Sequence, residues 1–169
     1  VECYPDLPLK EALQKLVDLE YSHVELALHE NEPHLQPSRV VSDMEAAVNI
    51  CRDTIRLDVS SYSVLIQATG QQHYEQFTAC CKLAKATKVA AITVPSAELG
   101  TPFNEEVEHL RKLVSIAMLE SVLVGMKTQE GRLSQDPDTV VVLCDNVKGL
   151  GVTLDPSHYI YGPHKGGSY

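Results

Sequence analysis

Five short apolar segments recur along the chain at intervals of about 30 residues, and this spacing constrains the fold more than any other feature. The segments begin near residues 22, 55, 89, 122 and 150, and apolar residues at helical spacing lie between them. About 30 residues is the length of one strand–helix unit, and a succession of such units requires a parallel sheet covered by helices. We therefore expect an α/β fold.

Two parallel architectures fit this pattern, an open doubly wound sheet and a closed barrel. No Gly-x-Gly-x-x-Gly follows the first strand and no phosphate-binding loop occurs, so a nucleotide-binding open sheet loses its main support. We prefer the (β/α)8 TIM barrel, with residues 1–169 forming one domain that holds about six of its strand–helix units. Such a barrel stays open, so either the sequence is a fragment or a partner, such as a second copy of the chain, fills the gap.

Individual residues predict several boundaries of helices and strands. Ser38 is a typical N-cap residue, and the helix that it caps is expected to bury a face formed by Val41, Met44, Val48 and Cys51. A strand is then expected over residues 55–59. Asp136 and Pro137 are typical of another helix start, and that helix is expected to bury Val140, Val141 and Cys144.

Composition excludes some classes of function. The formal net charge is −9 and no run of Lys or Arg occurs, which argues against nucleic-acid binding, since that affinity comes mainly from cations. No apolar stretch of about 18 residues and no signal-peptide pattern are present, so we expect a soluble, cytoplasmic protein without membrane contact. The five cysteines form no Cys-x-x-Cys pair, and we expect buried, reduced thiols.

Polar residues follow the predicted strands, where a barrel gathers its site. They are His29, Glu30, Glu98, Lys127, Gln129, Asp155 and His158. Asp155 and His158 are the strongest pair, because a carboxylate and an imidazole together can hold a divalent ion. A structural alternative is that Asp155 caps the turn formed by Pro156 and Ser157.

Three further positions are candidates for substrate or acid–base chemistry. Lys127 ends an apolar strand, where its ammonium could bind an anion, act as an acid or base, or form a Schiff base; a structural salt bridge fits as well. Glu25 lies inside a strand and is expected to point into the barrel, because the helix side would leave a buried carboxylate unpaired. The glycine-rich tail brings His164, which could meet an anionic substrate.

In these segments the chain resembles the xylose isomerase-like barrels, the superfamily of sugar phosphate isomerases and epimerases. Tyr21-Ser22-His23-Val24-Glu25-Leu26 is similar to the family's second strand, and Leu154-Asp155-Pro156-Ser157-His158 to its sixth. The resemblance implies a divalent metal (Mn, Mg, Zn or Co) held by carboxylates and a histidine at the strand ends. Asp155 matches one ligand position, with His158 beside it, but Lys127 replaces the glutamate expected after the family's fifth strand. A shift in register would offer Glu130 instead.

Two functional hypotheses follow from the residues and the resemblance. In the first, the protein is an isomerase or epimerase of a sugar, sugar phosphate or polyol. Lys127, Glu25 and His158 are then catalytic, His29, Gln129 and His164 bind substrate, and Asp155 and His158 hold any metal. In the second, the barrel has lost the strand-five ligand and binds a ligand without metal or catalysis. A weaker third hypothesis makes Lys127 the Schiff-base lysine of an aldolase-like enzyme.

Overall fold

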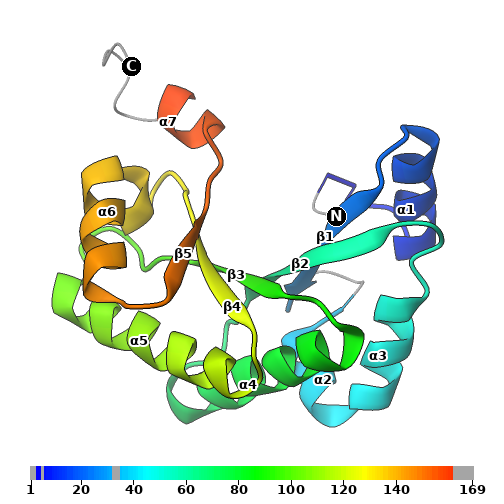
Figure 1. Ribbon diagram of the computed structural model, residues 1–169, viewed down its shortest axis with the longest axis horizontal. Helices are drawn as coiled ribbons and strands as arrows, with labels where there is room; N and C mark the ends of the chain where they lie inside the picture. The colour runs from blue at the N-terminus through cyan, green and yellow to red at the C-terminus, as the bar shows by residue number, and fades with distance from the viewer. Residues whose placement is uncertain (1–2, 5, 32–34, 162–169) are drawn as a thin grey trace.

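The computed structural model describes residues 3–4, 6–31 and 35–161. Figure 1 shows the chain alternating between helices and strands. The strands are β1 (His23–His29), β2 (Asp58–Leu65), β3 (Ala91–Pro95), β4 (Leu123–Lys127) and β5 (Leu150–Thr153). The helices are α1 (Leu9–Asp18), α2 (Pro37–Ser42), α3 (Met44–Arg52), α4 (Gly70–Thr87), α5 (Phe103–Leu119), α6 (Pro137–Asn146) and α7 (Ser157–Tyr161), with a 3₁₀ turn, η1 (Leu133–Gln135).

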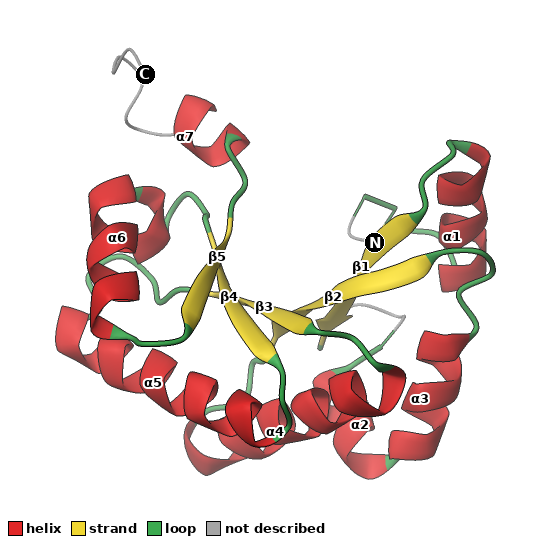
Figure 2. Ribbon diagram, viewed as in Figure 1, coloured by secondary structure: helices red, strands yellow, loops and turns green. Residues whose placement is uncertain are grey.

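The strands form one sheet in the order β1-β2-β3-β4-β5, and every neighbouring pair is parallel. Figure 2 shows this sheet curving, with α1 to α6 around its outer side. The prediction of consecutive parallel units of α/β type is confirmed. Five strands are present in the described residues, four of them close to their predicted places and β2 shifted along the chain, and α1 precedes the first of them.

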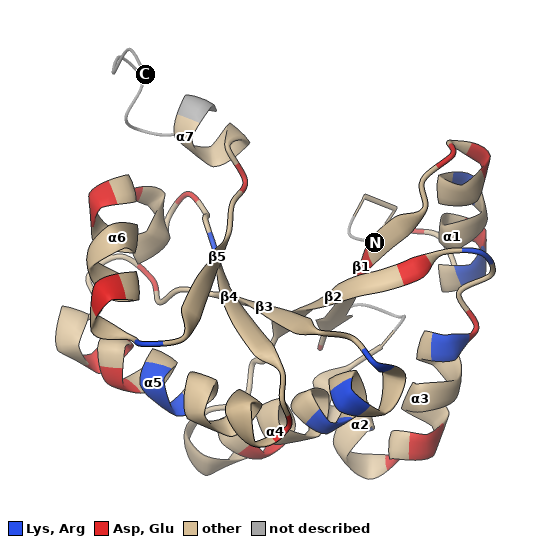
Figure 3. Ribbon diagram, in the orientation of Figure 1, with Lys and Arg blue, Asp and Glu red and all other residues tan. Residues whose placement is uncertain are grey.

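Strand residues alternate between two faces of different chemistry. Those on the outer face pack into the core with the helices: Val24, Leu26, Leu28, Tyr62, Val64, Ile92, Val94, Val124 and Met126, all buried. Most of the strand ribbon carries no charge, while the charged residues lie mainly on helices and loops (Figure 3). The inner face instead bears Glu25, Ser61, Thr93 and Thr153, which are linked by hydrogen bonds.

The prediction of one helix after Ser38 is wrong, because two helices, α2 and α3, occupy this segment. The backbone breaks at Asp43 (φ −146°, ψ 80°), and the Asp43 side chain then caps α3 by accepting from the backbone N–H of Ala46 at 3.0 Å. Because of the break, Val40 rather than Val41 enters the core, and Val41 is 53% exposed. The expected strand at 55–59 also begins later, at Asp58, because Ile55 has a left-handed backbone (φ 60°).

Helix α6 begins where the sequence predicts, but one of the residues expected to be buried on it is exposed. Asp136 caps the helix by accepting from the backbone N–H of Thr139 at 2.9 Å, and Pro137 occupies the first turn. Val140 is buried, but Val141 is 58% exposed and Leu143 takes the inner position instead. Val141 was misassigned because three consecutive valines leave the helical phase ambiguous.

All five cysteines are free thiols, and they differ in burial. Cys51, Cys80 and Cys81 are buried free thiols, whereas Cys144 is half-buried and Cys3 exposed. Burial raises the pKa of each of the three buried thiols.

Among the described residues, no helix combines the length and the apolar character that crossing a membrane requires.

Gly125 in β4 gives a first test of the inner face. A Cβ at this position would lie 2.5 Å from Thr153 Oγ1, which is held by Thr93 Oγ1 at 2.9 Å. Gly125→Ala is therefore expected to lower the free energy of unfolding by about 1–3 kcal/mol, measured by chemical denaturation. Gly151→Ala is the matched control, because its Cβ would meet only Val124 O at an ordinary 3.5 Å.

Adding Thr153→Ala to Gly125→Ala should recover part of this loss, because it removes the clashing oxygen. If Gly125→Ala were as stable as the Gly151→Ala control, the close packing of β4 against β5 would be contradicted.

Helices α4 and α5 meet through an aromatic and basic cluster. His73 and His109 have ring centroids 5.1 Å apart, Tyr74 Oη lies 3.1 Å from His109 Nδ1, and Lys112 Nζ lies 3.5 Å from the centroid of the Tyr74 ring. Burial, helped by His73 and Lys112, lowers the pKa of His109 from 6.5 to about 4. Burial also lowers the pKa of His73. Folding therefore favours the neutral form of both imidazoles.

The free energy of unfolding should consequently fall as the pH falls from about 6.5 to 4, because the unfolded chain binds a proton at His109 that the native state refuses. His109→Gln should show a smaller fall across this range than the unsubstituted protein, measured by denaturation at each pH. Equal slopes for the two proteins would contradict a neutral, buried His109.

Candidate functional site

A hollow of about 130 Å³ lies at the carboxyl ends of β1 to β4. Its walls are His29, Ser63, Val64, Leu65, Thr93, Val94, Pro95, Lys127, Gln129 and Arg132. The structure thus places three of the residues expected at the site, His29, Lys127 and Gln129, around one hollow, which we call the strand-end pocket. Carboxyl ends of parallel barrel strands are where such folds carry their active sites.

His29 is the last residue of β1 and is half-buried. Its Nε2 lies 3.2 Å from Ser63 Oγ, which comes from the adjacent strand β2. The imidazole is therefore oriented by a hydroxyl while its ring borders the pocket. An imidazole on a pocket wall is a candidate acid–base group.

Lys127 and Gln129 are positioned by a buried pair of serines. Ser134 Oγ donates to the carbonyl of Lys127 at 2.7 Å and accepts from the backbone N–H of Gln129 at 3.2 Å. Ser96 Oγ donates to Ser134 Oγ at 2.9 Å and accepts from the backbone N–H of Ser134 at 3.0 Å. These bonds join the loop after β3 to the loop after β4 and hold Lys127 at the pocket.

Arg132 lines the pocket but was not predicted. Its Nη1 donates to the carbonyl of Ser96 at 2.7 Å. Glu106, only 1% exposed, accepts from the backbone N–H of Ala97 at 2.9 Å and interacts with the Arg132 charge. Burial raises the pKa of Glu106, and the Ala97 hydrogen bond and Arg132 oppose that rise. One sequence signal existed: Glu106 stands four residues before Leu110, on the inner face of α5.

Glu25 points inward, as expected, but lies deeper than the pocket. Its Oε2 accepts from Ser61 Oγ at 2.6 Å and from Thr93 Oγ1 at 2.9 Å, and Thr93 Oγ1 contacts Thr153 Oγ1. It stands four positions before His29 in β1, a span of about 13 Å. Glu25 is accordingly absent from the pocket wall and is linked to hydroxyls of three other strands, of which that of Thr93 belongs to the wall.

Asp155 and His158 follow β5 and are neighbours. Asp155 Oδ1 accepts from the backbone N–H of Ser157 at 3.0 Å and from its hydroxyl at 2.6 Å, so this oxygen caps α7. Asp155 Oδ2 lies 3.7 Å from His158 Nε2, and His158 Nδ1 accepts from the backbone N–H of Glu130 at 3.4 Å. The hydrogen bond from the Ser157 hydroxyl has the largest effect and lowers the pKa of Asp155. Burial opposes it, while the Ser157 N–H, His158 and Lys127 lower the pKa further.

The described residues do not fit a divalent metal ion. No three His, Cys, Asp or Glu side chains gather there in a way that could hold one. Of the expected pair, one Asp155 oxygen is occupied by Ser157, and the position that should add a carboxylate holds Lys127. We therefore derive no step through a metal.

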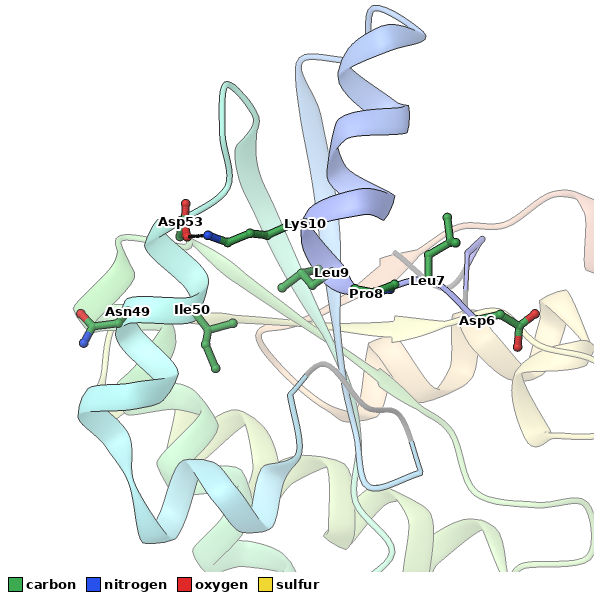
Figure 4. Close-up of a pocket in the computed structure, with 8 residues that line it drawn as sticks. All are labelled: Asp6, Leu7, Pro8, Leu9, Lys10, Asn49, Ile50 and Asp53. Carbon is green, nitrogen blue, oxygen red and sulfur yellow. Dashed lines mark ion pairs between the residues drawn. The ribbon is translucent and has the colours of Figure 1, made fainter.

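His164, which was predicted to bind substrate, lies outside the described residues. A second hollow lies apart from the strand-end pocket. A shallow hollow of about 760 Å³ lies between the start of α1 and the end of α3, where Figure 4 shows Lys10 paired with Asp53 beside Leu9 and Ile50. It is mainly apolar and lacks the converging polar groups of the strand-end pocket.

Neither a protein-family model nor a curated protein sequence matches the chain. Solved structures do match. A xylose isomerase-like TIM barrel protein from Mycobacterium smegmatis, in complex with magnesium, has a TM-score of 0.72 at 14% identity, over 95% of this chain and 62% of that one. The IolI protein with a bound zinc atom has a TM-score of 0.66 at 14% identity, over 92% and 60%.

The 3-keto-D-glucoside 4-epimerase YcjR from E. coli is also similar, with a TM-score of 0.61 at 12% identity, over 93% of this chain and 66% of that one. At these identities the likeness shows the fold. The expectation of a xylose isomerase-like TIM barrel fold is thereby confirmed, and the chain spans about three-fifths of the length of the barrels that it matches.

Ser134 provides a test of how the pocket loops are held. Ser134→Ala removes the hydroxyl shared by Lys127, Gln129 and Ser96, and is expected to lower the free energy of unfolding by about 1–3 kcal/mol in denaturant titrations. Ser115→Ala is the control, because this exposed hydroxyl bonds only within α5, to the carbonyl of Arg111. A Ser134→Ala variant as stable as the control would contradict the role of the serine pair.

Proposed function

We propose that the strand-end pocket binds a small sugar-like or polyol-derived carbonyl compound and transfers a proton beside its carbonyl group, as an isomerase or epimerase does. The observation that carries this proposal is the convergence of an imidazole, an ammonium and hydroxyl groups on one pocket, through His29, Lys127, Ser63 and Thr93.

The roles follow from the chemistry of each group. His29 takes the proton from the carbon next to the carbonyl, and that electron pair moves into the carbonyl to form an enolate. Lys127 neutralises the developing negative charge on the enolate oxygen. In an isomerisation His29 then returns the proton to the former carbonyl carbon, while the neighbouring hydroxyl group becomes the carbonyl and its proton passes to the enolate oxygen. In an epimerisation the opposite face of the same carbon takes a proton from a water molecule, and His29 gives its proton to solvent. Gln129 and the hydroxyls bind the substrate's own hydroxyl groups.

This assignment differs from the roles predicted from sequence. Glu25 and His158 were expected to be catalytic, yet neither is part of the pocket wall. In the proposal Glu25 orients the hydroxyls of Ser61 and Thr93, the second of which lines the pocket. Asp155 and His158 shape the loop after β5. His29, expected only to bind substrate, becomes the acid–base group.

The comparisons support the proposal by analogy. One similar fold is described as a 4-epimerase of a keto sugar, and TIM barrels place their chemistry at the strand ends where this pocket lies. Because the chain spans only part of the length of these barrels, the activity of the whole protein belongs to the proposal.

Exchange of substrate C–H for deuterium tests the proposal directly. The full-length protein would be incubated in D₂O with a panel of ketoses, aldoses and keto acids, and loss of the proton resonance followed by NMR. His29→Gln is expected to slow exchange by about 10²–10⁴-fold, since it removes the acid–base group. Lys127→Met is expected to slow it by about 10²–10³-fold, since it removes the charge that stabilises the enolate.

Lys148→Met is the matched control, because it removes an exposed lysine outside the pocket and should leave exchange unchanged. Exchange that persists at full rate in both His29→Gln and Lys127→Met would refute the proposal. So would the absence of exchange with every compound in the panel for the unsubstituted protein.

A further inference from the structure

The charged side chains on the wall of the strand-end pocket are all positive. It contains two cationic side chains, Lys127 and Arg132, and neither Asp nor Glu. This is unusual for a chain whose formal net charge is −9. Two cations at one small hollow set up a local positive potential that favours a negatively charged ligand group.

Arg132 presents donors that the described protein does not use. Its one side-chain hydrogen bond within the described residues runs from Nη1 to the Ser96 carbonyl, which leaves Nε and Nη2 without an acceptor there. The charge of the guanidinium also interacts with Glu106, which is almost fully buried and accepts from the N–H of Ala97. The bond to Ser96 thus fixes one nitrogen of the guanidinium, while the edge formed by Nε and Nη2 has no acceptor among the described residues.

Lys127 lies on the same wall, and its charge acts on Asp155 just as the charge of Arg132 acts on Glu106. The two side chains differ in their donors, because a guanidinium presents paired N–H groups in a fixed plane and an ammonium does not. Arg132 is therefore the stronger candidate for anchoring a planar anionic group.

The loops around the pocket also indicate which anion fits. Phosphate sites usually rely on several free backbone N–H groups. In the loops after β3 and β4, five N–H groups are already bonded to side chains: those of Ala97, Gln129, Glu130, Gly131 and Ser134. One edge of the Arg132 guanidinium keeps its paired donors, which match the two oxygens of a carboxylate.

We propose that Arg132 anchors the carboxylate of a small hydroxylated acid in the strand-end pocket, so that the substrate of the proposed reaction is a sugar acid or keto acid rather than a neutral sugar. This inference deepens the proposed function and rests on it for the reaction, but the carboxylate site itself can be measured without turnover. The hollow of about 130 Å³ suits a compound of a few carbon atoms.

Calorimetric titration of the full-length protein with three matched probes tests the inference. The probes are glycerate, glycerol and glycerol phosphate, which share a carbon skeleton and differ in the terminal group. Glycerate is expected to bind at least about tenfold more tightly than glycerol, because it gains a charge-assisted pair of hydrogen bonds. Tighter binding of glycerol phosphate than of glycerate, or equal binding of glycerol and glycerate, would overturn the carboxylate assignment.

Substitutions locate the site. Arg132→Met should weaken glycerate binding by about tenfold or more, and Arg132→Lys should weaken it as well, because a lysine keeps the charge but loses the paired donors. Arg56→Met is the control, since it removes one exposed positive charge outside the pocket and should leave glycerate binding unchanged. Thermal unfolding of each variant shows whether it folds, and Arg132→Lys supplies the test if Arg132→Met does not.

Failure of this inference can be told apart from failure of the proposed function. Glycerate binding that does not depend on Arg132, with deuterium exchange that still depends on His29 and Lys127, would overturn the carboxylate anchor alone. Arg132-dependent binding of glycerate without any exchange would support the anchor and remove the proposed reaction.

Discussion

The fold depends on the burial of one face of a parallel sheet against its helices. Nine strand side chains on that face, from Val24 to Met126, are buried with the helices in one core. Burying a side chain of this size contributes about 1.5–3 kcal/mol, so this layer is the main source of the sheet's stability. The opposite, inner face of the sheet therefore does not need to supply apolar side chains to this core. Instead of the large branched residues usual inside such barrels, it carries hydroxyls, glycines and Glu25.

The polar inner face leads directly to the site. Each strand that buries its outer residues must direct alternate residues inward, and the last inward residues of β1 and β4 are His29 and Lys127. The Ser96–Ser134 pair then fastens the loops after β3 and β4 together, and this arrangement brings Arg132 to the same pocket. Strand order thus assembles side chains that stand about 100 residues apart in the chain, without any of them being adjacent in sequence.

Continuous apolar runs made most of the fold predictable. The segments near 89 and 122 contain little besides branched and small apolar residues, and they became β3 and β4. The strand β2 was misplaced because serines occupy its inner positions and interrupt the apolar signal. The inward direction of Glu25 could be foreseen, since a carboxylate facing the helices would have been costly. Arg132 could not, because its relation to Glu106 depends on how α5 packs against the loops after β3 and β4.

A cation-lined pocket is the central claim of this account. Where the xylose isomerase-like resemblance leads one to expect a carboxylate, the chain has Lys127, and Arg132 lies on the same wall. The most direct measurement is a crystal structure of the full-length protein with glycerate bound. We expect the carboxylate to accept hydrogen bonds from Arg132 and the hydroxyls to face His29 and Lys127. Glycerate bound elsewhere, or with its carboxylate turned away from Arg132, would contradict the account.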